Sequence, residues 1–463
     1  MASQTINESQ PKTVYLSEQL QFKPMELEPH GENRVRKQAT ITGNGPFTEL
    51  TNDVVITITA NQMNKMALLQ NAYIVVDITN NNANSIYFQG RGGTLMIIES
   101  LTLSNTSGLS LNYFRDYNVL AGIELCKNMD SQYQDCVGSS LFGLSSSDIA
   151  GQVITGTTSE DATGGTGAAP ATAGTVTKII PMAGICNLFK LCPLWGVEDL
   201  VITLKIANPK NIYRCNAIAT ASTGPPIVVG RATANIDAGS VVYSNLRFIY
   251  ETIDIPVEIF KSYLKSMGNQ FYLSGSDWYS TNATIAQDTT STNIPIPVVK
   301  NCVKRVLACM RTSANLLSNQ KVSICSRNRC TFNECYLTYN SVSYPVTTIK
   351  IKTNSISEQL AEVMISSSNH LMNLTSANLD ATKYALAEGA ANTDATCGLF
   401  WYEFNLTNHL QDDNSTYSGL NVSANNLSLN LNGGTTNAVQ RIDIFVEYQV
   451  DYILDNGIWS VRS

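Results

Sequence analysis

Charged side chains are scarce in this sequence. Asp, Glu, Lys and Arg make up 14% of the 463 residues, against about 25% in an average soluble domain. With apolar residues at 43%, the other positions are filled mainly by Asn, Ser, Thr and Gly, which is typical of a chain rich in strands and loops. The formal net charge of −7 argues against a protein whose whole surface binds nucleic acid.

Long apolar runs are missing as well. No stretch reaches 18 apolar residues, so no transmembrane helix is expected. The N-terminal sequence MASQTINESQPK is polar, whereas a secretory signal has a charged start and an apolar core. We therefore expect a soluble, non-secreted chain. Its eleven cysteines are expected to be mostly reduced and buried, because a chain of this length needs no disulfide framework.

The usual signatures of catalysis are also missing. The chain has three histidines, His30, His370 and His409, and each lies in a polar segment typical of a solvated loop. There is no HExxH and no GxSxG motif, and no glycine run continues to the Gly-Lys-Ser/Thr that would bind phosphate. The sequence therefore nominates no catalytic, cofactor-binding or metal-binding residue, and it predicts neither an enzyme nor a small-molecule substrate.

One cysteine pattern resembles a metal site. Cys325, Cys330 and Cys335 are spaced regularly, but structural zinc needs four ligands, usually from closely spaced pairs. An offset of five residues also places neighbouring strand side chains on opposite faces. We expect ordinary buried thiols here. The adjacent acids Asp412 and Asp413 lie among Asn and Ser, which indicates a solvated loop rather than a general acid and base.

Alternation of apolar and polar residues gives the clearest structural signal. Residues 53–60 (DVVITITA), 201–206 (VITLKI) and 441–452 (RIDIFVEYQVDY) alternate with the period of two that half-buried strands show. The fold class predicted is all-β, with short helices in connecting loops at 257–266 and 356–365. Further strands are predicted at 72–78, 94–103, 177–180, 241–252, 303–310, 331–339, 346–352, 399–406 and 427–431.

Composition divides the chain into four parts. We expect an N-terminal arm at 1–50, a first β domain at 51–253, a connection at 254–299 and a second β domain at 300–463. Two long loops are expected in the first domain. The loop at 138–177 is rich in Gly, Ala, Ser and Thr, and the loop at 217–239 contains Pro225 and Pro226.

Charge is distributed unevenly in the second half. Residues 300–333 contain seven basic and no acidic residues, whereas residues 385–460 contain nine acidic residues and Arg441 as the only Lys or Arg. Two interpretations stay open. The segments could form complementary patches on neighbouring copies of the chain, or they could be adjacent strands of one domain that neutralise each other. The simpler expectation is the second.

The order of the segments resembles a known family. The opening strands 53–81, the strand and connection at 246–282, the strand–turn–Tyr-Pro segment CYLTYNSVSYP at 335–345, and the segments 401–413 and 441–457 follow the order found in double jelly-roll major capsid proteins of tailless icosahedral double-stranded DNA viruses. That group includes the coat proteins of membrane-containing phages, virophages and Polinton-type elements, and adenovirus hexon. The N-terminal arm and the short terminal tail depart from the pattern.

The resemblance implies a fold and a function. Two consecutive eight-stranded jelly rolls in one chain would form a wedge whose homotrimer is pseudo-hexagonal and tiles an icosahedral shell. The two long loops would project outward. Expected partners are further copies of the chain, then vertex or penton proteins and minor capsid proteins, in a virion assembled inside the host cell. The arm, with Arg34, Arg36 and Lys37, would contact genome, an internal membrane or a neighbouring subunit, or be an ordinary polar tail.

Two other classes compete with this interpretation. A β-sandwich lectin or adhesin would use aromatic residues within 271–279, or Trp401 and Tyr402, to stack on a sugar. The alternative for those residues is core packing, which is the more common role of such aromatics. A β-rich hydrolase using carboxylates is the third class, and no pair of acids stands out from the polar background to support it.

Overall fold

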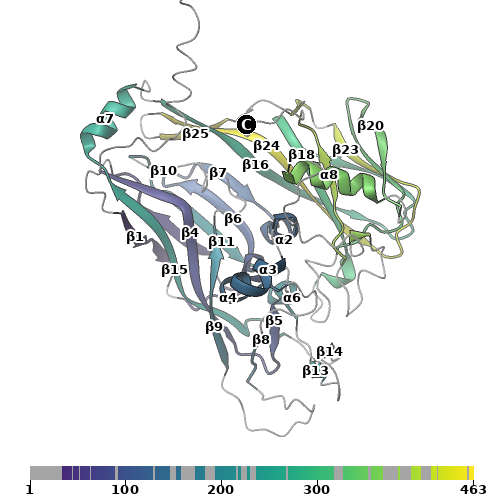
Figure 1. The fold of residues 1–463 in the computed structure, drawn as a ribbon, viewed down its shortest axis with the longest axis horizontal. Coiled ribbons are helices and arrows are strands. Elements are labelled where there is room, and N and C mark those ends of the chain that lie inside the picture. Colours follow the sequence, from purple (N-terminus) through teal and green to yellow (C-terminus); the bar gives the residue numbers. More distant parts are fainter. Residues whose placement is uncertain are drawn as a thin grey trace, which may run out of the picture.

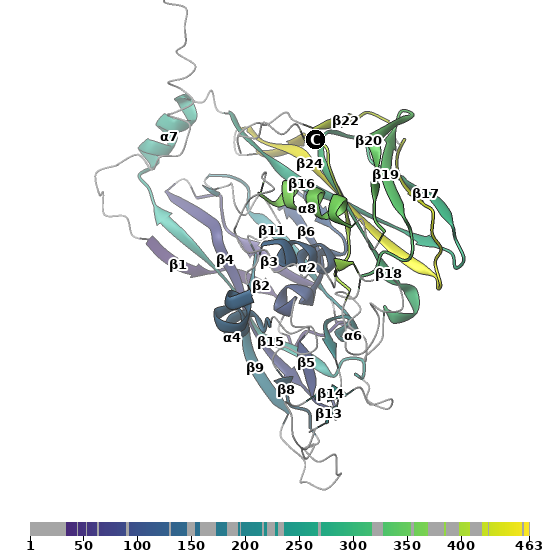
Figure 2. The same cartoon turned by 45° about the vertical axis from the view of Figure 1, so that its right-hand side comes forward.

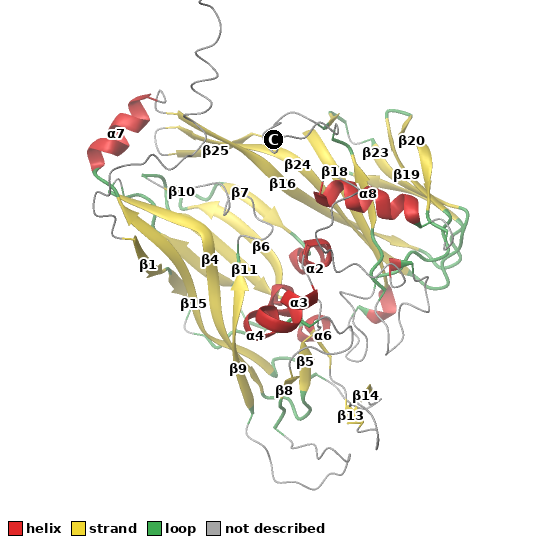
Figure 3. Cartoon of the chain, in the orientation of Figure 1, coloured by secondary structure: helices red, strands yellow, loops and turns green. Residues whose placement is uncertain are grey.

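The computed structural model describes most of the chain from Arg34 to Arg462. The described residues are 34–43, 45–51, 53–62, 64–88, 92–128, 131–145, 153–157, 173–182, 193–194, 196–214, 217–219, 227–229, 236–266, 270–316, 327–352, 356–368, 384–385, 398–407, 419–424, 426–455 and 458–462. Strands dominate them, as Figure 3 shows, and every pairing between the named strands is antiparallel. The predicted all-β class is confirmed.

Two sheets form the body of the first half, here called the first unit (Figure 1). The first sheet runs β1 (Arg34–Gln38), β15 (Val241–Asp254), β4 (Lys65–Asn80) and β10 (Pro193–Leu194), with β9 (Gly174–Pro181) also paired to β4. The second sheet runs β2 (Thr40–Thr42), β3 (Val54–Ile58), β11 (Leu200–Ile206), β6 (Ile98–Asn105) and β7 (Ser110–Phe114).

Short strands lie at one end of the first unit. They form a sheet of β12 (Tyr213–Arg214), β5 (Ile86–Phe88) and β8 (Val153–Ile154), and a hairpin of β13 (Ala217–Ala219) and β14 (Ile227–Val229). β8 lies in the loop predicted at 138–177, and β13 and β14 lie in the loop predicted at 217–239. Both views place these strands together at the same end (Figures 1 and 2). The described strands of the two long-loop regions therefore lie at the same end of the first unit.

The second half contains another two sheets, here called the second unit (Figure 2). One sheet runs β16 (Gln270–Ile285), β24 (Gln440–Asp455), β18 (Lys300–Thr312) and β21 (Tyr402–Asn405), with β22 (Leu420–Val422) on β18 and β25 (Ile458–Arg462) on β24. The other runs β17 (Ser291–Ile296), β23 (Leu427–Asn432), β19 (Glu334–Tyr339) and β20 (Val342–Lys350).

Helices are short and lie between strands. They are η1 (Gly93–Ile97), α2 (Tyr117–Asn128), α3 (Ser131–Tyr133), η2 (Gln134–Gly138), α4 (Ser139–Phe142), α6 (Pro209–Ile212), α7 (Val257–Ser266), η3 (Ser313–Asn315) and α8 (Ser357–Ser368). The helices predicted at 257–266 and 356–365 correspond to α7 and α8. Within the described part of the chain, no helix has the length and apolar character needed to span a membrane.

The alternation of apolar and polar residues along the strands explains which side chains form the core. In β3, Val54, Ile56 and Ile58 are buried, and the residues between them are partly exposed. In β23, Leu427, Leu429 and Leu431 point inward in the same way. Successive strand side chains point to opposite faces, so in strands such as β3 and β23 one face packs against the partner sheet and the other is more exposed. The long strands β18 and β24 are largely buried on both faces.

The structure corrects three expectations. The strand predicted at 94–103 begins as the buried helix η1, and strand geometry starts at Ile98. The connection predicted at 254–299 contains β16 and β17, which pair with β24 and β23 of the second unit. Part of the arm predicted at 1–50 is also strand, because β1 and β2 extend the two sheets of the first unit at their edges. We propose that the division between the units lies at α7.

Sequence periodicity did not indicate the helix α2. The first seven residues of α2 are all buried, from Tyr117 to Ile123. A helix that is covered on all sides shows no apolar stripe with a period of 3.6 residues. α2 packs against η1 and β6, which hold it on the side of the first unit that faces the second unit (Figure 1).

The close packing of η1 against α4 depends on Gly93, which has φ +51°. A Cβ at Gly93 would overlap the backbone oxygen of Phe142, whereas a Cβ at Gly108, with φ +84°, would have no neighbour within 4 Å. We expect Gly108→Ala to cost about 1 kcal/mol of unfolding free energy, because left-handed backbone disfavours a Cβ. Gly93→Ala should cost at least about 2 kcal/mol more because backbone must also move.

Urea unfolding of the two variants measures this difference. Equal losses for Gly93→Ala and Gly108→Ala would mean that the contact between η1 and α4 tolerates a methyl group.

Candidate functional site at the junction of the two units

One segment of the first unit meets the long sheet of the second unit. The segment consists of β7 and α2, joined by Arg115 and Asp116, and β7 contacts both β16 and β25. Four of its polar side chains reach partners in the second unit: Asn112, Asp116, Glu124 and Lys127. We call this contact the junction.

Arg305 of β18 is the central cation of the junction. Its guanidinium pairs with Glu124 of α2 at 3.0 Å, with Glu403 of β21 at 3.3 Å, and with Glu447 of β24. It also lies 4.7 Å from the centre of the Trp278 ring, a favourable cation–π position. Burial lowers the pKa of Arg305, but the three carboxylates outweigh burial and raise that pKa above its ordinary value. The guanidinium is therefore held as a permanent cation.

A second cation enters from the first unit. Lys127 near the end of α2 donates to Glu403 across 2.7 Å, and neither side chain has any exposed surface. The other oxygen of Glu403 accepts a hydrogen bond of 2.8 Å from Trp401 Nε1. A buried ion pair is tolerated only when its remaining hydrogen-bonding capacity is satisfied in this way.

A second cluster joins the other end of α2 to β24. Asp443 accepts from Arg311 at 2.6 Å and from Arg441 at 2.7 Å, and Arg441 also reaches Asp116 at 2.8 Å. Burial raises the pKa of Asp116, and the neighbouring charge of Asp443 raises it further, against the lowering effect of the arginines. The cluster alternates in sign, so each buried charge has an opposite neighbour.

A third contact uses a carboxylate that has no cation within ion-pair distance in the described contacts. Asp277 of β16 is 1% exposed, and it accepts hydrogen bonds from Asn112 of β7, from Tyr452 OH at 2.9 Å and from its neighbour Trp278 N at 2.9 Å. Burial raises the pKa of Asp277 to about 7, against the opposing effect of these donors and of the more distant Lys300.

These contacts decide between the two interpretations of the uneven charge. The basic segment forms β18, which pairs with β24 and β21 from the acidic segment, so Arg305 lies opposite Glu447 in register. The expectation of internal neutralisation is confirmed for Arg305 and Arg311, which pair with Glu403, Glu447 and Asp443 of the acidic segment. The partners from the first unit were missed, because Asp116, Glu124 and Lys127 belong to no charge cluster in the sequence.

The cysteine pattern does not form a metal site in the described residues. Cys330 and Cys335 are buried and free, with Cys330 Sγ 3.2 Å from Asn328 Oδ1 and Cys335 Sγ 3.4 Å from Gln359 Oε1. No cluster of metal-ligating side chains occurs in that part of the chain. Of the five free cysteines described, Cys309 is also buried, whereas Cys302 is partly exposed and Cys136 is exposed. The predicted burial of thiols therefore holds for three of them.

Of the aromatic residues proposed for sugar stacking, Trp278, Trp401 and Tyr402 lie in the core, and Tyr279 is partly buried against it. The side chains of Phe271 and Tyr272 are outside the described part of the structure. Trp401 and Tyr402 have no exposed surface, and Trp278 is 5% exposed. Trp401 stacks edge-on against Tyr384, and Tyr402 against Phe400, with ring centres 5.1 and 4.7 Å apart. Buried rings cannot receive a ligand from solvent, so Trp278, Trp401 and Tyr402 pack the core and provide no platform for a sugar.

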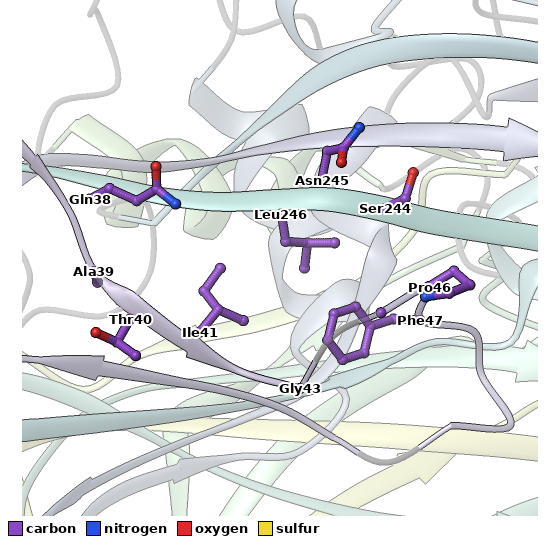
Figure 4. A pocket seen from close by; sticks show the side chains of 11 residues that line it. Gln38, Ala39, Thr40, Ile41, Gly43, Pro46, Phe47, Ser244, Asn245 and Leu246 are labelled. Atoms are coloured by element: carbon purple, nitrogen blue, oxygen red, sulfur yellow. The ribbon is translucent and has the colours of Figure 1, made fainter.

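A surface pocket of about 580 Å³ lies in the first unit (Figure 4). It forms where the chain crosses from β1 to β2 beside β15. Ile41, Phe47 and Leu246 supply its apolar wall, and Gln38 and Asn245 supply amides. No ionisable side chain lines it, so it offers no general acid or base, and no base lies in the lining to activate the hydroxyl of Thr40 or Ser244.

Several residues considered in the sequence lie outside the described residues. They are His30, His370, His409, Cys325, Asp412 and Asp413. The junction is the site in the described part of the chain where buried ionic groups connect the two units.

Comparisons with known proteins identify the fold. No protein-family model matches the sequence, and no curated protein matches it. Among solved structures, PBCV-1 VP54 fitted into a reconstruction of the virophage Sputnik is similar with a TM-score of 0.57 at 10% identity, covering 94% of this chain and 97% of that chain.

Two further capsid proteins match over most of their length. The mavirus major capsid protein gives a TM-score of 0.52 at 11% identity, covering 92% of this chain and 90% of that one. The Faustovirus major capsid protein gives 0.52 at 10% identity, covering 91% and 90%. The chain has the double jelly-roll fold of these proteins, as the order of its segments suggested.

The junction predicts a specific energetic pattern. Lys127→Met leaves Glu403 with one cation fewer in a buried site, and we expect a loss of about 3–5 kcal/mol of unfolding free energy. Adding Glu403→Gln should recover part of that loss, because the uncompensated charge is removed. Lys205→Met breaks an exposed pair with Glu99, whose side chains are 51% and 40% exposed, and should cost less than about 1 kcal/mol.

Urea unfolding of the single and double variants measures these energies. If Lys127→Met were as mild as Lys205→Met, the contact between Lys127 and Glu403 would contribute no more than a surface pair.

Proposed function

We propose that the chain is a viral major capsid protein, a structural subunit that forms homotrimers and tiles an icosahedral shell. The observation that carries this proposal is the double jelly-roll fold, shared with three proteins over at least 90% of each chain. Two of the three are named major capsid proteins. The proposal places the chain in the virion and gives it a structural rather than an enzymatic role.

The geometry of the chain supports a subunit of this kind. Two units in one chain, each built on two main sheets, contribute two similar bodies to every copy. Three copies then present six bodies around one axis, and a near-hexagonal outline tiles a shell. The junction supports the same role, because buried ion pairs fix the position of one unit against the other. A fixed relative position is what repeated contacts between identical copies require.

The ends of the first unit suggest an orientation in the shell. β8, β13 and β14, which belong to the two long-loop regions, lie at one end, and α7 lies at the opposite end (Figures 1 and 2). We assign the long-loop end to the outside of the shell, where loops are least constrained. The end with α7 then faces inward.

The inward end carries a cluster of basic residues. Arg34 and Arg36 on β1 have side chains 57% and 72% exposed, both near Glu251. The pKa of Lys37 is lowered by burial and by the neighbouring charge of Lys65, which shows that cations gather here. Lys261 and Lys265 add two more exposed cations on α7. This end suits an anionic layer beneath the shell, either genome or membrane lipid.

Vertex or penton proteins and minor capsid proteins complete the proposed partners.

The assembly state tests the proposal first. We expect the purified chain to elute with a mass three times the 50.4 kDa of one chain when light scattering is coupled to size exclusion. Negative-stain images of that species should show a pseudo-hexagonal outline. A stable interface of this kind buries well above about 2,000 Å², so the trimer should persist at micromolar concentration. A clean monomer would contradict the proposal and make a glycan array the next experiment.

The inward end has its own test. Co-sedimentation with vesicles containing anionic lipid, and separately with duplex DNA, should show binding that weakens as salt is raised. Lys261→Glu combined with Lys265→Glu should weaken that binding, whereas Lys205→Glu on β11, an exposed lysine elsewhere in the first unit, should leave it unchanged. Equal effects of the two replacements would contradict a localised anionic contact, and the ligand that binds identifies the layer.

A further inference from the structure

Asp277 connects the two units without a cation of its own. Its Oδ1 accepts from Asn112 of the first unit and from Trp278 N, and its Oδ2 accepts from Tyr452 OH. Asp277 is 1% exposed, Asn112 is 7% exposed and Tyr452 is fully buried. A carboxylate in such a place is satisfied by neutral donors alone, and one of those donors belongs to the other unit.

The titratable groups around Asp277 come from two neighbouring strands. On β24, Tyr448 lies opposite Asp277 in register, and Tyr452 donates to it. On β18, Lys300 has its Nζ 4.3 Å from the centre of the Tyr448 ring and acts on Asp277 from a longer distance. β7 contributes the neutral amide of Asn112. Lys300 is thus the one cation that opposes protonation of Asp277 among the described groups around it.

We propose that docking of the two units is linked to a proton on Asp277, so that the junction is tightest when this carboxyl is protonated and loosens when it ionises. Opening of the junction removes Asn112 and admits water to Asp277. Once hydrated, the carboxyl group of Asp277 returns towards the ordinary pKa of Asp and releases its proton near neutral pH. Opening and proton release are therefore two parts of one equilibrium.

The direction of the pH dependence follows from burial. Burial raises the pKa of Asp277 in the closed junction to about 7, whereas a hydrated Asp titrates near 3.9. Below pH 4 both states hold the proton, so pH has no effect. Between about 4 and 7 the open state releases a proton that the closed state keeps, and the closed state loses stability as pH rises. Above about 7 both states are ionised and the effect levels off.

Hydrogen exchange of the full-length protein tests the proposal, whatever its assembly state. Protection of backbone amides in β7 and β16, corrected for the intrinsic exchange rate at each pH, reports opening of the junction. We expect opening to increase about a hundredfold between pH 5 and pH 8, from the two pKa values above. Asp277→Asn keeps the shape of the side chain without its charge, and it should abolish this increase.

Two comparisons isolate Asp277. Asp288→Asn changes an exposed carboxyl in the turn between β16 and β17, where φ is +60° and Asn is well tolerated, and it should retain the full pH dependence. Asp116 also titrates at the junction, but it is unchanged in all these proteins, so its contribution cancels in the difference between wild type and Asp277→Asn.

A second variant keeps the test decisive if Asp277→Asn does not fold. Tyr452→Phe removes a donor that favours the ionised carboxylate, so it should move the midpoint of the pH dependence upward. Lys300→Met should move the midpoint in the same direction, because it removes the opposing cation. A wild-type profile that is flat, or a midpoint that neither variant moves, would overturn the proposal. Neither outcome depends on whether the chain forms trimers, so failure of the capsid proposal would be seen separately.

Discussion

The position of Arg305 constrains the rest of the structure. This one guanidinium pairs with carboxylates from α2, β21 and β24, so it needs groups from both units at once. Removing a charge from water costs several kcal/mol, and close opposite charges together with hydrogen bonds offset that cost. If the units separated, Glu403 would also lose Lys127, a pair with no exposed surface. The charges at the junction are therefore compatible with the closed arrangement and penalise partial docking.

A chain of packing contacts in the first unit brings α2 to the junction. η1 packs against α2 on one side and against α4 on the other, and the left-handed backbone at Gly93 allows η1 to approach the Phe142 carbonyl. α2 then presents Asp116 just before its first turn and Lys127 in its last. The two residues reach Arg441 and Glu403, so both ends of one helix are fixed to the second unit by ion pairs.

Sequence patterns predict what depends on local periodicity and miss what depends on tertiary burial. β3 and β11 were predictable because one face of each strand meets the core and the other is at least partly exposed. β24 was predictable because apolar and polar residues alternate along it, although both of its faces are largely buried. α2 was not, because burial on all sides leaves no stripe. The junction was half predictable: Arg305 and Glu447 belong to segments of opposite charge that pair as strands, whereas Glu124 is an isolated acid in an apolar helix and carries no sequence signal.

The positions of the few charged side chains are compatible with the proposed role in a shell. The most closely packed ionic groups described lie at the junction, and the outer face of the sheet of β17, β23 and β19 is left largely to neutral side chains. There Asn293 donates to Asn430 at 2.7 Å, and Asn430 donates to Thr338 at 2.7 Å. Amides that satisfy each other across strands can be covered without leaving a buried charge or an unmet hydrogen bond. A surface of this kind can meet another copy of the chain at low desolvation cost, while charge inside each copy keeps its two units in one arrangement.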